Sequence, residues 1–190
     1  MATKTISRRK QIKDIAQNHF RKKGYKAAAM RTIADEVGIE AASLYFHFRS
    51  KEEMLREICF DMADEFFSGF NALDEKLSPT EKLMFALENH LHVMENSEDS
   101  FFVFMNDWRH LSEPYLSQFK TLRKKYEQRF ERIIEEGIMK KEFVKLDSAL
   151  TAQIILSSIN ASINWFNPKK MNPEVFSKHL ITLLANGILK

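Results

Sequence analysis

The sequence is short of cysteine, glycine and proline, and each shortage excludes something. Its single cysteine, Cys59, cannot form an internal disulfide and fits the reducing cytoplasm, where we expect the protein to be. Five glycines and four prolines in 190 residues leave few helix breakers, which favours long helices over a sheet. Apolar runs are shorter than the ~18 residues of a membrane span, and the N-terminus lacks the apolar core of a signal peptide.

Common catalytic and metal-binding patterns are missing as well. There is no HExxH, no Cys-x-x-Cys and no glycine-rich phosphate loop. His90 and His92 are two residues apart on a predicted helix, so their side chains point to different faces and make a poor metal pair. We therefore predict that the protein is not an enzyme and binds neither a cofactor nor a metal.

Charge is distributed unevenly along the chain. Residues 1–56 contain 13 lysines and arginines but only 6 aspartates and glutamates, whereas the remainder contains 16 basic and 20 acidic residues. This asymmetry points to an anionic partner at the N-terminal end, for which double-stranded DNA is the obvious candidate. An ordinary lysine-rich surface would give the same count, so charge alone leaves both interpretations open.

Apolar periodicity predicts an all-α protein of about nine helices. The first spans roughly residues 7–23 and ends at Gly24; a short second covers 30–37 and ends at Gly38; a third begins near Ala41. Three short helices, the last two separated by a glycine turn, form a helix-turn-helix unit. Later helices are predicted at 51–76, 79–95, 101–111, 114–136 (ending at Gly137), 147 to just before Pro168, and 173–187. Ser78 and Glu81 form a predicted capping box for the helix at 79–95, and Asp147 is a candidate cap for the helix that follows it. We divide the chain into a DNA-binding domain, 1–50, and a ligand-binding and dimerisation domain, 51–190.

An ordered series of short motifs makes the N-terminal unit specific. In order they are Gly24-Tyr25, Met30-Arg31-Thr32-Ile33-Ala34, Val37-Gly38-Ile39, Ser43-Leu44-Tyr45-Phe46-His47-Phe48 and Lys51-Glu52-Glu53-Met54. The series closely resembles the DNA-binding domain of TetR/AcrR-family regulators over about fifty residues. The resemblance predicts DNA contacts for Arg31, Thr32, Ala41, Ala42, Ser43, Tyr45, Phe46, His47 and Lys51.

The residue types in the third helix agree with that prediction. A helix entering a major groove about 12 Å wide needs small residues near its N-terminus, and Ala41, Ala42 and Ser43 are small. The resemblance assigns phosphate contacts to Tyr45 and His47, although packing in the core is the simpler alternative for both. Phe46 lacks a hydroxyl and offers apolar contact alone.

Departures from the family pattern precede the second and third helices. Ala28 and Ala29 replace the usual Thr or Ser cap, at a cost of roughly 1 kcal/mol in helix stability, and Glu40 replaces a common Ser. We expect these changes to alter operator preference or affinity. Arg8, Arg9 and Lys10 either reach an adjacent groove or form a solvated, disordered arm.

The C-terminal part carries two apolar helices in succession. Ile155, Ile159 and Ile163 mark the first, and the 176–184 stripe marks the second. The family resemblance implies that these helices pair with those of a second copy; alternatively, the stripes close the monomer core.

Polar residues interrupt the apolar segment 104–111, where Asn106, Asp107, Arg109 and His110 occur. They form either an internal Asp–Arg network or contacts to a polar or anionic head group of a ligand. This segment, with Gly137, Glu142-Phe143 and residues 165–168, resembles the sensor domains of TetR-type regulators of fatty-acid and acyl-CoA metabolism. The predicted ligand-binding residues are Asn106, Trp108, Arg109, His110, Asn160 and Trp165.

These observations predict a homodimeric transcription regulator that binds a palindromic operator, and we expect it to be a repressor. A small, largely apolar effector such as a fatty acid or acyl-CoA would release it. The sixteen phenylalanines and nine methionines could line an apolar pocket, and they could equally form a helical core. The alternative is a helical binding protein whose helix-turn-helix mediates protein contacts.

Overall fold

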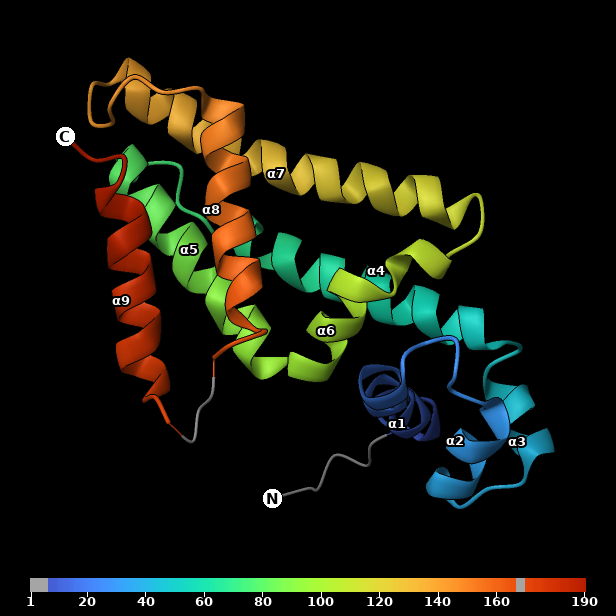
Figure 1. Ribbon diagram of the computed structural model, residues 1–190. Helices are drawn as coiled ribbons and strands as arrows, with labels where there is room; N and C mark the ends of the chain where they lie inside the picture. The colour runs from blue at the N-terminus through green and yellow to red at the C-terminus, as the bar shows by residue number, and fades with distance from the viewer. Residues whose placement is uncertain (1–6, 167–169) are drawn as a thin grey trace, which may run out of the picture. The chain divides into compact units, whose positions relative to one another are not determined.

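The computed structural model describes residues 7–166 and 170–190 and confirms an all-α fold. Within that part of the chain there are nine α-helices and one short 3-10 helix, η1. Their bounds are α1 Arg8–Lys23, α2 Met30–Val37, α3 Ala41–His47, α4 Lys51–Asn71, α5 Pro79–Asn96, α6 Glu98–Asn106, η1 Trp108–His110, α7 Tyr115–Met139, α8 Ser148–Ser162 and α9 Pro173–Asn186 (Figure 1).

The helices pack into two compact units. The first contains the described residues up to Ala63 together with Ser97–Lys120, and the second contains Asp64–Asn96 and Thr121–Lys190. Sequence-distant α6 and η1 therefore belong with the helix-turn-helix. Whether residues 1–50 suffice for DNA binding is a separate question, and the predicted functional boundary at residue 50 stays a prediction.

The first unit is built around α1. Its core contains Ile12, Ala16 and Phe20 from α1, which are the i, i+4 and i+8 positions of one helix face. Both α2 and α6 pack against α1. Arg21 near the end of α1 pairs with Glu98 at 2.9 Å and with Asp99 at 2.7 Å, both at the start of α6. The helix-turn-helix and α6 are thus joined by apolar packing and by ion pairs.

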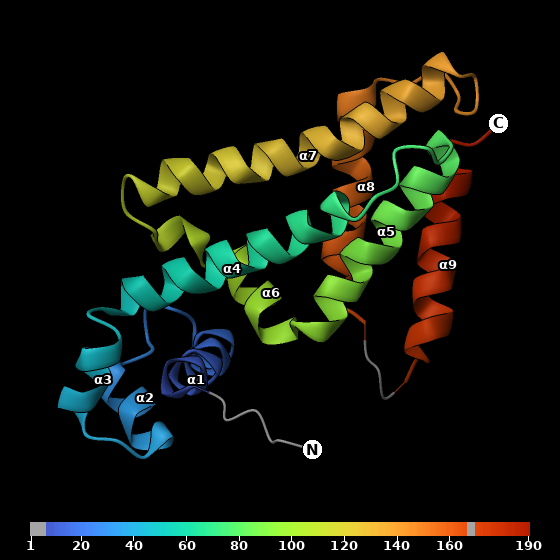
Figure 2. The same ribbon diagram turned by 180° about the vertical axis from the view of Figure 1, so that it is seen from behind.

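The second unit has an aromatic interior and side-chain caps on its helices. The Tyr126 ring contacts Phe66, Phe70 and Phe130, and Phe70 also contacts Phe130, with centroids 5.2–5.6 Å apart. The predicted capping box of α5 is confirmed, because Ser78 N–H donates to Glu81 and Glu81 N–H donates to Ser78 Oγ. Figures 1 and 2 show α9 beside α5, with which it packs.

Several predicted helix boundaries are wrong, for local reasons. Helix α4 ends at Asn71 because Asp74 forms a turn, accepting hydrogen bonds from Lys76 N–H and Leu77 N–H. Helix α7 runs through Gly137, which is needed there for close packing: a Cβ at this position would lie 2.2 Å from the Phe143 ring.

The segment predicted as one helix at 101–111 is two pieces. Helix α6 begins earlier, at Glu98, and the chain changes to the 3-10 helix η1 after Asp107. Helix α8 begins with the predicted Asp147 cap but ends at Ser162. The expected limit at Pro168, and the Asn167-Pro168 part of the sensor resemblance, lie outside the described residues.

Candidate functional site

A left-handed glycine fixes the turn between α2 and α3. Gly38 has φ 74° and ψ 38°, a conformation that glycine adopts without a steric cost, and its N–H bonds back to the carbonyls of α2. Ile33, Ala34, Leu44 and Phe48 are fully buried below the turn. The two short helices therefore face the core on one side and solvent on the other, as a helix-turn-helix requires.

The solvent side of α3 carries the residues predicted to meet DNA. Ala41, Ala42 and Ser43 are exposed, Tyr45 is 51% exposed and Phe46 is 87% exposed. Of the four consecutive ring-bearing residues 45–48, only Phe48 is in the core, as expected, and His47 is half-buried. The alternative that Tyr45 packs in the core does not hold, so its hydroxyl and the Phe46 ring are available to a partner.

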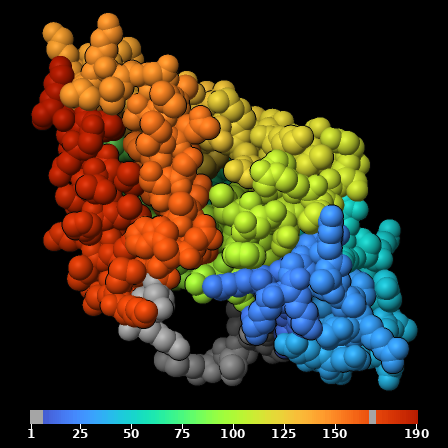
Figure 3. All heavy atoms as spheres, in the orientation of Figure 1, coloured from blue at the N-terminus to red at the C-terminus, as the bar shows by residue number. Residues whose placement is uncertain are grey.

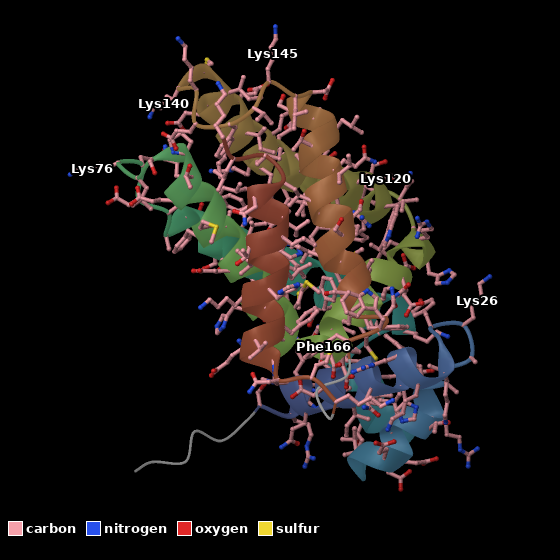
Figure 4. The ribbon with its side chains drawn as sticks, turned by 60° about the vertical axis from the view of Figure 1, so that its left-hand side comes forward. Lys26, Lys76, Lys120, Lys140, Lys145 and Phe166 are labelled. Carbon is pink, nitrogen blue, oxygen red and sulfur yellow. The ribbon has the colours of Figure 1, made fainter. Side chains whose placement is uncertain are left out.

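Near α3, Arg31 and Thr32 are exposed in the first turn of α2. Lys51, in contrast, is partly buried and makes contacts inside the first unit. The Lys51 ammonium donates to the carbonyls of Tyr25, Lys26 and Ala28 at 2.6–3.0 Å. It also lies 4.5 Å from the centre of the Tyr25 ring. Burial lowers the pKa of this amine. Lys51 thus holds the loop that precedes α2, while the side chain of Lys26 points outward (Figure 4).

Arg9 fixes the other end of α3. Its guanidinium lies 3.9 Å from the centre of the Phe48 ring, donates to the His47 carbonyl, and pairs with Glu53 and Glu57. Arg8, Arg9 and Lys10 form the first turn of α1, so the interpretation of these residues as a disordered arm is wrong. Ser7 caps this turn by accepting from Lys10 N–H.

Four of the predicted ligand-binding residues lie in the first unit, in or next to η1. Arg109 is exposed with its guanidinium 4.5 Å from the centre of the Trp108 ring. His110 stacks on Tyr25 with centroids 5.1 Å apart. Asn106 is exposed and its amide donates to the Phe102 carbonyl. The segment predicted to bind ligand therefore also contacts the helix-turn-helix.

Asp107 and Arg109 have different partners. Asp107 is buried and accepts the backbone N–H of Tyr25, and burial raises its carboxyl pKa. Within the described part of the chain, the Arg109 guanidinium lies over the Trp108 ring and not beside the Asp107 carboxylate. The internal Asp107–Arg109 network that the sequence suggested is therefore not the arrangement found.

The two other predicted ligand-binding residues, Asn160 and Trp165, lie in the second unit. Trp165 is 57% exposed and makes an edge contact with Phe176. Asn160 accepts a 2.9 Å hydrogen bond from Nε2 of His90, whose Nδ1 lies 2.9 Å from the Tyr126 hydroxyl. Because Nε2 donates, Nδ1 accepts from Tyr126, and one chain of hydrogen bonds joins α5, α7 and α8.

Sequence reasoning missed the buried pair at the centre of that chain. His90 is 2% exposed, and burial lowers its pKa to about 4, so the ring is neutral at physiological pH. Burial also raises the pKa of Tyr126 well above its ordinary value. The available signal was position: His90 follows Leu83, Ala86 and Leu87 on the apolar stripe of α5.

A surface groove of about 470 Å³ lies between α5 and α9. It is lined by Phe85, Glu88, Asn89, Leu91, His92, Glu95, Pro173, Glu174, Ser177 and Ile181, and none of the six predicted ligand-binding residues is among them. Across the described residues, no group of three or more His, Cys, Asp or Glu side chains is placed to hold a metal ion. No helix there has the length and apolar character needed to cross a membrane.

The buried turn and the exposed α3 define the first unit as a helix-turn-helix of the DNA-binding type. Residues 12–58 match the family model of bacterial regulatory proteins of the tetR family, and residues 76–188 match the tetracyclin repressor-like C-terminal domain. The chain belongs to the TetR family of transcription regulators, as the motif series predicted.

Relatives are similar along nearly the whole chain. The HTH-type transcriptional repressor KstR2 of Mycolicibacterium smegmatis is 29% identical over 186 residues, 96% of this chain and 91% of that protein. The fatty acid metabolism regulator protein of Bacillus subtilis is 24% identical over 182 residues, 94% of each. The solved structure of the ketosteroid transcriptional regulator KstR2 of Mycobacterium tuberculosis has a TM-score of 0.91 at 26% identity, covering 100% of this chain and 98% of that one.

Proposed function

We propose that this protein is a homodimeric transcription repressor that binds a palindromic operator and is released by a small, largely apolar effector. The observation that carries the proposal is the exposed face of α3, where small residues and two aromatic rings lie open to solvent on a short, firmly held helix. The basic excess of residues 1–56 adds the charge that phosphate binding needs.

Dimerisation is supported by apolar side chains left exposed on the last two helices. Leu150 and Ile154 on α8 are each 55% exposed, and Val175 and Leu183 on α9 are 66% and 65% exposed. Figures 1 and 4 show α8 and α9 side by side, and Figure 3 shows them on one face. The opposite sides of these helices already fill the core through Ile155, Ile159 and Ile181. A second copy would cover the exposed side.

The effector class is supported by the aromatic interior of the second unit and by the relatives. Phenylalanine and tyrosine rings surround the neutral His90–Tyr126–Asn160 chain. The names of the relatives refer to fatty acid metabolism in one case and to a ketosteroid regulator in another. We infer a fatty acid, an acyl-CoA or a compound of similar polarity, with Asn106, Trp108, Arg109, His110, Asn160 and Trp165 as candidate contacts.

Release is proposed to pass through η1 and α6. A ligand that displaces Arg109 or His110 would disturb the stacking of His110 on Tyr25. It would also shift α6, whose Glu98 and Asp99 hold Arg21 of α1. Both connections end on the helix-turn-helix, so the orientation of α3 in each protomer would change, and a dimer whose two recognition helices no longer match successive half-sites loses affinity.

The test begins with selection of DNA fragments by the purified full chain, followed by titration of the selected duplex at increasing salt. Phosphate contacts predict a linear fall of log affinity with log salt concentration. If the chain selects no duplex at low ionic strength, the proposal is wrong and the alternative, a helix-turn-helix for protein contacts, is favoured. Adding palmitoyl-CoA or oleic acid to the complex then tests release.

The dimer is tested separately with Ile154→Glu. We expect this variant to sediment as a monomer and to lose operator affinity, because a buried carboxylate in an apolar interface is costly. Met139→Glu is the matched control, since Met139 is 75% exposed on α7 and outside the α8/α9 face. A dimeric Ile154→Glu variant would contradict the proposed interface.

A further inference from the structure

The exposed face of α3 is divided into two rows of different chemistry. Residues four apart lie on the same side of a helix, so Ala42 and Phe46 form an apolar row and Ser43 and His47 form a polar row beside it. All of these side chains are exposed except His47, which is half-buried. The polar row can make hydrogen bonds, but the apolar row has no group that bonds a phosphate or a base edge.

Phe46 is the most exposed large apolar side chain among the described residues, at 87%. The neighbouring rings are arranged otherwise: Phe48, directly after α3, is fully buried, and Tyr45 on α3 carries a hydroxyl. Phe46 adds little to the core, and its ring contact is an edge contact with His47 at 5.6 Å. An apolar ring in this position gains free energy only when a partner removes it from water.

The backbone that carries the Phe46 ring is held in place by its surroundings. Arg9 fixes the end of α3, because its guanidinium donates to the His47 carbonyl and lies over the Phe48 ring. The residues on either side of that end are therefore fixed, and the Phe46 backbone with them. Little further ordering of the backbone would be needed on binding, which favours a specific contact over an adaptable one.

In the major groove of a duplex, the apolar group that a protein can contact is the C5-methyl of thymine. We infer that the Ala42–Phe46 row reads thymine methyl groups, and that it specifies thymine at defined positions of each operator half-site. This inference rests on the proposed DNA-binding function and deepens it. The row would thus select sequence, while Tyr45, Arg31 and the polar row hold the phosphate backbone and other base edges.

The experiment replaces thymine by uracil, one position at a time, in the duplex selected by the full chain. Uracil lacks only the methyl group, so hydrogen bonding and phosphate contacts are unchanged. At the contacted positions we expect affinity to fall by about three- to fivefold, the effect of removing one buried methyl. At the position that Phe46 contacts, Phe46→Ala should bind the thymine and uracil duplexes equally, because the partner of that methyl is gone, whereas a methyl contacted by Ala42 should keep its effect.

Two controls keep the outcome interpretable. Phe46→Ala should unfold at the same temperature as the original chain, since an 87% exposed side chain contributes little to the core. Met139→Ala removes another highly exposed apolar side chain, 75% exposed and on a different helix, and should retain the thymine preference in full.

The possible outcomes distinguish failure of the thymine inference from failure of the proposed DNA-binding function. A chain that binds its selected duplex with steep salt dependence, yet shows no uracil-sensitive position, would overturn the thymine inference and leave DNA binding intact. The thymine inference is overturned in the same way if, at every uracil-sensitive position, uracil lowers affinity equally for Phe46→Ala and the original chain. A chain that selects no duplex would overturn both.

Discussion

The helix-turn-helix and the second unit use aromatic side chains in opposite ways. On α3 the rings of Tyr45 and Phe46 lie in solvent, 51% and 87% exposed. In the second unit Phe70, Tyr126 and Phe130 contact one another, and Tyr126 and Phe130 also contact the neutral His90 ring. The exposed rings add little to the free energy of unfolding and would contribute free energy only when a partner covers them. The buried rings raise the free energy of unfolding. Exposure therefore separates the residues proposed to bind DNA from core residues of the same type.

The sharpest way to test this comparison is to truncate one ring from each region. Phe130→Ala should lower the free energy of unfolding by about 3–5 kcal/mol, because it leaves a cavity among Phe70, His90 and Tyr126. Phe46→Ala should change it by less than about 0.5 kcal/mol. Urea unfolding followed by circular dichroism measures both. Equal losses in the two variants would contradict the division into binding and core aromatics.

The buried histidine of the second unit should make stability depend on pH. The pKa of His90 is lowered from 6.5 to about 4 by burial. Above pH 6.5 the ring is neutral in both folded and unfolded chains, so it contributes no pH dependence there. Between pH 6.5 and pH 4 the unfolded chain takes up a proton that the folded chain does not, which destabilises the fold by up to about 3 kcal/mol.

The variant His90→Gln isolates this contribution, because other titrating groups are common to both proteins. We expect its stability to be lower than that of the original chain at about pH 7.5, and the difference to shrink as pH falls toward about 4. A difference that is constant with pH would mean that His90 takes up its proton at the same pH in the folded and unfolded chains, contrary to its burial.

The buried side of each helix was largely predictable from sequence, whereas the groups that join helices were not. The stripe of Ile12, Ala16 and Phe20 and the caps at Ser78 and Asp147 follow from spacing and residue type alone. Gly137 led to a wrong helix end, because the sequence does not distinguish a glycine that ends a helix from one that allows a side chain, here Phe143, to pack closely against the backbone. His90 and Asn160 are seventy residues apart, and only the fold brings them together.

The candidate site divides in the same way. The exposed residues of α3 were predicted because a short motif fixes their position relative to the turn. The roles of Arg9 and Lys51 were missed because their partners are the His47 carbonyl and the carbonyls of the loop before α2, which no sequence pattern identifies. Long basic side chains can reach several partners, so residue type alone does not say which one they take.

The two regions also satisfy lysine amines differently, and Lys51 offers a test. In the second unit Lys82 pairs with Glu136 at 3.0 Å and Glu75 at 3.2 Å. In the first unit Lys51 has three carbonyls instead. Lys51→Met should lower stability by about 1–3 kcal/mol, since charge-assisted hydrogen bonds to the loop before α2 are lost.

The same variant tests the predicted phosphate contact of Lys51. If the ammonium serves the loop alone, the salt slope of operator binding should be unchanged once measured on fully folded protein. A slope smaller by about one would show that Lys51 also neutralises a phosphate. Arg31→Met, which removes an exposed cation from the first turn of α2, is the comparison, and its slope should fall by about that amount.

The smallest expected effect concerns helix capping, where α2 differs from α1 and from helices of the second unit. Helices α5, α8 and α9 of the second unit begin with side-chain caps at Ser78, Asp147 and Asn172. Ala29, the N-cap residue before α2, has the extended conformation of a cap, φ −106° and ψ 138°, but no side chain to accept a hydrogen bond. Ala29→Ser should therefore stabilise the first unit by about 1 kcal/mol.

Amide hydrogen exchange in α2 measures this gain locally, and Ala27→Ser is the control, since Ala27 is also exposed but precedes the cap. A stabilised α2 holds Arg31 and Thr32 more firmly, so operator affinity should not fall if these residues contact DNA in the conformation described. Affinity that falls as α2 becomes more stable would mean instead that α2 has to loosen on binding, and that the uncapped start of the helix serves recognition.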